Sequence, residues 1–78
     1  MKTLNELDAV ALTCDVREFA LKAGDVGTAL LVHDAGVAFD VEFVGYDGHT
    51  VALTTLESAQ VRLLQNSDVL HARELSHA

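Results

Sequence analysis

A turn followed directly by an apolar strand, in the stretch Leu21–Val32, constrains the fold more than any other part of the chain. Gly24 suits a turn that needs positive φ, the Asp25 side chain can cap its own turn, and Gly27 allows a neighbouring backbone to come close. From residue 26 onward the stretch is apolar or small. We therefore expect the chain to fold around a β-strand that begins directly after this turn.

The predicted strand over residues 26–33 carries apolar or small side chains on both faces, with Ala29, Leu31 and His33 on one of them. A strand that is apolar on both faces is covered on both faces in the folded protein. In a chain of 78 residues, the second cover is expected from the N-terminal segment, the C-terminal tail or another subunit. Ala29, Leu31 and His33 are therefore candidate interface residues.

Four further strands are predicted from alternating apolar and polar residues and from turn signals between them. Asp47 and Gly48 form one of the strongest short hairpin signals, and Gly36 provides positive φ for an earlier turn. With the strand described above, the predicted strands cover residues 8–14, 26–33, 37–43, 50–55 and 61–64. In the third and fourth strands, the side chains expected to face the core are Val37, Phe39, Val41, Phe43, Val51 and Leu53.

Two segments have no clear strand pattern. Residues 15–23 are expected to form a loop anchored by Phe19 and Leu21, which favours a structural over a functional role. In the tail, residues 65–78, Ser67 could cap a short helix, but the segment is equally compatible with an added strand, a frayed end or an oligomer clasp. The apolar tail residues, which are further interface candidates, are Val69, Leu70 and Leu75.

The charge balance is acidic, with twelve Asp and Glu against five Lys and Arg and a formal net charge of -7. The few cations are scattered along the sequence, which disfavours nucleic-acid binding. Half of the residues are hydrophobic. A small domain with this many apolar residues often buries part of its surface in an interface. The single cysteine, Cys14, cannot form an intramolecular disulfide, which favours a reducing compartment. We also find no signal peptide and no apolar run long enough to span a membrane. The sequence therefore predicts a cytoplasmic protein outside the membrane.

No local pattern predicts catalysis, a metal site or a cofactor. The four histidines do not form ligand pairs at zinc-site spacing, and the trio Ser58, His33 and Asp34 lacks the surrounding nucleophile motif. Nor do we expect much room for a ligand pocket of the usual size, about 300–1,000 Å³. We therefore expect no enzyme activity. The histidines are His33, His49, His71 and His77.

The chain contains six segments that fit one family pattern: Leu7–Leu12, Leu21–Thr28, Val41–Val44, Asp47-Gly48, Leu53–Leu56 and Gln60–Arg62. In this order they resemble a small bacterial family catalogued as domain of unknown function 4926, over residues 4–64. The resemblance implies a compact Src-homology-3-like β barrel of the bacterial cytoplasm, with no established activity and no catalytic residues to carry over. The chain departs from the family pattern after Leu64, so we divide it into a β domain, residues 1–64, and a tail, residues 65–78.

The sequence thus predicts a mainly β fold, a small five-stranded Src-homology-3-like barrel, that acts as a non-catalytic interaction module for a basic protein partner. A homodimer through the second-strand face or the tail is also expected, and sedimentation at micromolar concentration tests it. The alternative is an RNA-binding barrel of the ribonucleoprotein type. That alternative requires Arg17, Lys22 and Arg62 to converge near Phe19 or Tyr46.

Overall fold

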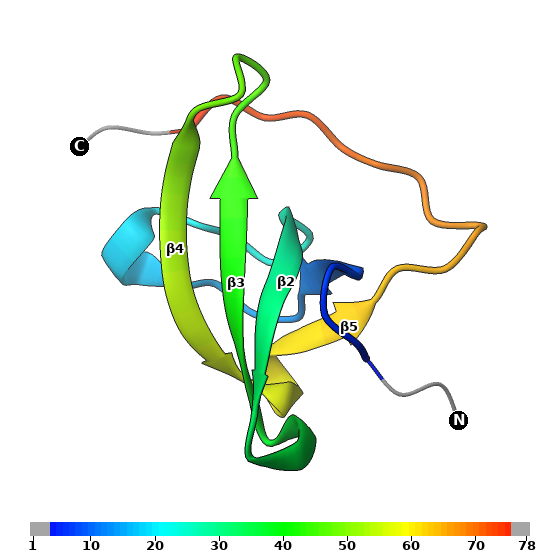
Figure 1. Ribbon diagram of the computed structural model, residues 1–78. Helices are drawn as coiled ribbons and strands as arrows, with labels where there is room; N and C mark the ends of the chain where they lie inside the picture. Colours follow the sequence, from blue (N-terminus) through cyan, green and yellow to red (C-terminus); the bar gives the residue numbers. More distant parts are fainter. Residues whose placement is uncertain (1–3, 76–78) are drawn as a thin grey trace.

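The computed structural model describes residues 4–75, which form a mainly β domain around one sheet. Five antiparallel strands lie in the order β4-β3-β2-β1-β5. Figure 1 shows β2, β3 and β4 running upright side by side while β5 runs across them, so the sheet is strongly curved. The strands are β1 (Ala9–Leu12), β2 (Val26–His33), β3 (Ala38–Val44), β4 (Thr50–Glu57) and β5 (Val61–Leu63), and the 3-10 turns are η1 (Arg17–Phe19), η2 (Asp34–Gly36) and η3 (Ser58–Gln60).

The prediction of a mainly β fold with five strands is confirmed. The predicted bounds of β2 coincide with the observed ones, and the other four predicted strands differ from the observed strands only at their ends. Closure of the sheet into a Src-homology-3-like barrel stays a prediction from the family resemblance.

Every second side chain of β3 lies in the core, together with apolar side chains from other parts of the chain. Val10 and Val41 are the largest side chains that are fully buried, and Phe39 and Phe43 are nearly so. Phe39, Val41 and Phe43 alternate along β3 with the polar Asp40 and Glu42, as a strand with one face on the core requires. The remaining members of the core cluster are Leu12, Val16, Leu21, Ala29, Ala52, Leu56 and Val61.

At Gly27, residues of β3 pack too closely to leave room for a side chain. A Cβ atom added at Gly27 would lie 2.8 Å from the backbone oxygen of Glu42, 2.8 Å from Val41 Cγ1 and 2.9 Å from Phe43 Cδ2. Because one of these neighbours is backbone, the strands would have to separate to admit a side chain. The predicted reason for glycine at this position, close approach of another backbone, is confirmed.

The face assignments of three predicted core residues are wrong. Val37, Val51 and Leu53 are 59%, 39% and 55% exposed. In β4 the register slips between the pair Phe43↔Ala52 and the pair Val44↔Thr50, and the inward positions are those of Ala52 and Leu56. Since neighbouring strand residues point to opposite faces, this register puts Val51 and Leu53 outside. Val37 lies outside because it precedes β3, at the end of η2.

The loop over residues 15–23 is anchored, but not by both predicted residues. Leu21 is buried and forms an isolated bridge with Val16, which is buried as well. Phe19 instead ends the turn η1 and is 37% exposed. The loop is therefore closed on itself by Val16 and Leu21, with Phe19 at the surface.

Residues 65–75 of the tail adopt neither the short helix nor the added strand that were two of the alternatives left open by the sequence. A turn at its start is fixed by Asp68, whose carboxylate accepts hydrogen bonds from both terminal nitrogens of Arg62, at 2.9 and 2.8 Å, and from the Gln65 N–H. These contacts lower the pKa of Asp68 to about 2, chiefly through Arg62. From this turn the chain crosses in an extended path toward the end of the β3–β4 hairpin (Figure 1).

Candidate functional site

A β-bulge in β2 separates the residues that the sequence placed on one face. Ala29 pairs with Val41, but the next paired residue, Leu31, lies opposite Asp40, so one extra residue stands between them. As a result Ala29 is fully buried whereas Leu31 is 50% exposed. A bulge of this kind reverses which side chains face the core beyond it. Ala29 therefore belongs to the core and is withdrawn as an interface candidate.

Beyond the bulge, strands β2, β3 and β4 present apolar and acidic side chains on the same side. Directly opposed residues on antiparallel strands point to the same face, and the pairs here are Leu31↔Asp40 and Glu42↔Leu53. Both leucines are at least half exposed. We name this surface the outer face; it consists of Leu31, His33, Asp40, Glu42, Leu53 and Thr55.

Asp40 is the fixed negative charge at the centre of the outer face. Its Oδ1 accepts a hydrogen bond from Thr55 Oγ1 at 2.6 Å, and His33 Nε2 lies 2.9 Å from the same oxygen. The hydrogen bond from Thr55, and then that of His33, hold the pKa of the Asp40 carboxyl below its usual value. The carboxylate is therefore ionised at neutral pH, with Leu31 directly opposite it on β2 and Thr55 directly opposite it on β4.

Strand β4 adds an open hydrogen-bonding edge beside the outer face. It is at one end of the strand order, and among the described residues it pairs only with β3. With eight residues it is one of the two longest strands of the sheet. The free backbone groups of such an edge are a template for another extended segment.

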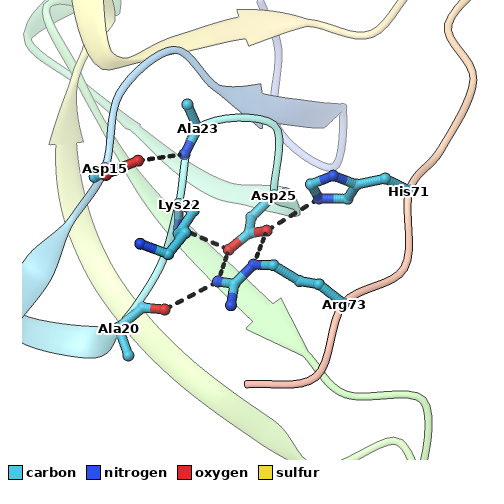
Figure 2. A network of polar contacts seen from close by, with 7 residues as sticks. All are labelled: Asp15, Ala20, Lys22, Ala23, Asp25, His71 and Arg73. Atoms are coloured by element: carbon cyan, nitrogen blue, oxygen red, sulfur yellow. Dashed lines mark hydrogen bonds and ion pairs between the residues drawn. The ribbon is translucent and has the colours of Figure 1, made fainter. Parts of the chain in front are cut away.

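A second polar cluster joins the tail to the turn before β2 (Figure 2). Arg73 donates to the Asp25 carboxylate through Nε, at 2.9 Å, and through a terminal nitrogen, which also donates to the Ala20 carbonyl at 2.9 Å. His71 Nε2 lies 3.1 Å from the same carboxylate, and the Lys22 N–H donates to it at 2.8 Å. One aspartate thus accepts hydrogen bonds from its own turn and from the tail.

The Asp25 carboxyl is ionised in spite of its surroundings. Burial raises its pKa, but the hydrogen bonds from Arg73, from the Lys22 N–H and from His71 outweigh burial and leave the pKa below its usual value. The bond from Lys22 confirms that Asp25 caps its own turn, and Gly24 has the predicted positive φ, +92°. The contacts with His71 and Arg73 were not predicted.

An open groove of about 640 Å³ lies between this tail segment and the end of the β3–β4 hairpin. Its volume falls in the range of ligand sites, so the expectation of little room for a pocket is wrong. Leu70 and Leu75, two of the predicted tail interface residues, line the groove, while Val69 is outside it and 94% exposed. Its other residues are Asp25, Val26, Phe43, Val44, Gly45, Tyr46, Val51, His71, Ala72 and Arg73.

The remaining candidate residues are the histidines and the cations named for RNA binding. Each described histidine contacts one carboxylate, and His49 is paired with Asp47 in the exposed β3–β4 turn, where Gly48 has φ +86°. His77 lies outside the described residues. Of the cations invoked for RNA binding, Arg62 is engaged by Asp68. In residues 4–75 no group of three or more His, Cys, Asp or Glu residues could hold a metal ion.

The five strands in one sheet define a small, mainly β domain. The chain belongs to the family described as Domain of unknown function (DUF4926), whose model matches residues 6–63. The tail that holds Asp25 is outside the matched residues. Comparison with curated proteins and with solved structures found no match. Within the described part, no helix is long and apolar enough to cross a membrane.

Proposed function

We propose that the chain is a non-catalytic interaction module that binds a basic protein through the outer face. The observation that carries this proposal is the ionised Asp40, directly opposite the exposed Leu31, on a face that also bears Glu42 and the exposed Leu53. Apolar side chains with a charge of one sign among them suit a partner that combines apolar and cationic residues. The homodimer expected from the sequence stays a prediction of this proposal.

Two further features support a basic protein as the partner. The net charge of -7 steers cationic partners toward the chain and repels nucleic acids. The open edge of β4, next to Leu53, can accept an extended segment of the partner by backbone hydrogen bonds. Contact with the leucines would then provide the apolar area, and Asp40 and Glu42 would select for positive charge.

Affinity capture from a lysate of the source organism tests this function with a double variant, Leu31→Ser and Leu53→Ser. We expect the amount of the basic protein recovered with the double variant to be at least tenfold lower than with the unsubstituted chain. Both leucine side chains are exposed, so they contribute to binding rather than to folding. Val69→Ser is the matched control, since Val69 is exposed but outside the outer face. It should leave recovery unchanged.

The capture also separates the proposal from its alternative. Half of each sample is treated with nuclease before capture, because an RNA-binding barrel would lose its bound material on this treatment. Equal recovery by the double variant and the unsubstituted chain would contradict the outer face as the binding surface. Recovery abolished by nuclease would favour RNA binding instead.

A further inference from the structure

We propose that the Asp25 carboxylate and the Ala20 carbonyl form a binding site for an arginine of a partner protein, which the chain's own Arg73 occupies in the free state. The inference rests on the proposed function in that it takes the partner to be basic. It adds a second recognition point, away from the outer face, and a role for the tail as an intramolecular competitor.

The contacts of Arg73 show how the site holds a guanidinium group. Two of its nitrogens donate to the two carboxylate oxygens of Asp25, and one of them also donates to the Ala20 carbonyl (Figure 2). Parallel bonds of this kind match the planar fork of arginine and not the single ammonium of lysine. With the tail in place, the Asp25 side chain is 12% exposed and the Arg73 side chain is 24% exposed, so the bound guanidinium is partly shielded from water.

The acceptor groups are positioned by the β domain and not by the tail. Asp25 is fixed by the Lys22 N–H at its carboxylate and by the Leu12 N–H, which donates to its carbonyl at 2.9 Å. Ala20 has φ +57°, and its N–H donates to the Arg17 carbonyl at 3.1 Å. The donor, Arg73, instead belongs to an extended segment with no helix or strand. The acceptor groups are therefore built into the β domain, whereas their occupant belongs to a segment without regular secondary structure.

The groove beside Asp25 defines what should flank the arginine. Val26, Val44 and Val51 line it from the β domain, and the tail contributes Leu70 and Leu75. In the tail, the arginine thus stands between two leucines, three positions before and two positions after it. A partner segment that replaces the tail should likewise carry an arginine flanked by large apolar residues.

Attachment to the same chain gives the tail an advantage over any partner segment. A short flexible connection corresponds to an effective concentration in the millimolar range. A competing segment binds only the fraction of molecules from which the tail is displaced, so its apparent affinity is the intrinsic affinity multiplied by that fraction. Weakening the tail contact should accordingly strengthen binding of a segment supplied by another molecule.

A labelled peptide with the sequence of residues 68–75 is the probe, and fluorescence anisotropy measures its binding to the full chain. We expect the Arg73→Gln chain to bind the peptide at least tenfold more tightly than the unsubstituted chain, because its acceptor site has lost its own arginine. Adding Asp25→Asn to this chain should abolish the gain. The Arg17→Gln chain, which removes the same charge at an exposed side chain of the β domain, is the matched control and should behave like the unsubstituted chain.

Two control peptides differ from the probe by one substitution each, Arg73→Gln in one and Arg73→Lys in the other. Both peptides should bind the full chain that carries Arg73→Gln at least tenfold more weakly than the probe does. Amide NMR shifts at Ala20 and Lys22 on adding the probe would locate binding and show that each variant is folded. Equal affinity of the Arg73→Gln and unsubstituted chains, or a gain that survives Asp25→Asn, would overturn the inference. Because the probe is the chain's own tail, such a failure leaves the lysate test of the outer face unaffected.

Discussion

Replacing Gly27 with alanine is expected to lower the free energy of unfolding by about 2–3 kcal/mol, as overpacking of a close-packed interior does. The new Cβ would lie 2.8 Å from both the Glu42 backbone oxygen and Val41 Cγ1. The backbone oxygen cannot move away by a side-chain rotation, so β2 and β3 must shift. Unfolding in urea, followed by circular dichroism, measures the change.

Gly45→Ala is the matched control for this substitution. Gly45 has no positive φ, and the nearest atom to an added Cβ is Asp47 Oδ1, at 3.1 Å, which a rotation of that exposed side chain can move. We expect a change within about 0.5 kcal/mol, as for other surface substitutions. A similar stability loss for both variants would show that the close approach at Gly27 is not the cause.

Replacing Asp25 with alanine is expected to lower the free energy of unfolding by about 2 kcal/mol, the magnitude for hydrogen bonds to a charged group. The substitution leaves the Lys22 N–H and Arg73 without their shared acceptor. It should also detach the tail, seen as faster amide hydrogen exchange at the Ala20 turn. Asp47→Ala is the control, because Asp47 also caps a turn but its side chain is 69% exposed.

The Asp25 contribution should depend on pH in one direction. The folded-state pKa is below the ordinary value of 3.8, so this stabilisation is fully present above pH 3.8 and is lost as the pH falls through the folded pKa. The stability difference between the unsubstituted chain and Asp25→Ala should therefore be constant near neutral pH and shrink in acid. A difference that grew in acid would contradict an ionised Asp25.

Local patterns were sufficient to predict the strands and the turns. Both Gly24 and Gly48 have positive φ, a conformation in which other residues are strained, so glycine marks these turns in the sequence. The alternation of Phe39, Val41 and Phe43 with polar residues indicates a strand with one buried face. These features depend on neighbouring residues, so they can be read from a short window of sequence. The strand order also depends on the pairing of β1 with β5, two strands far apart in the sequence, and no short window of sequence contains that information.

The candidate site depended on features without a local pattern. The bulge between Ala29 and Leu31 moved one into the core and the other to the surface, although both are apolar and two positions apart. Asp25 and Arg73 are 48 positions apart in the sequence. No spacing rule connects residues so distant, and the isolated aspartate predicted only a capped turn.

The most direct test of the outer face as a binding surface is photo-cross-linking in cells of the source organism. A photoreactive amino acid replaces Leu53 in one chain and Val69 in another, both being exposed positions. The proposed function predicts that the Leu53 position yields a cross-link to one basic protein and that the Val69 position does not. Cross-links to the same protein from both positions, or from Val69 alone, would contradict it.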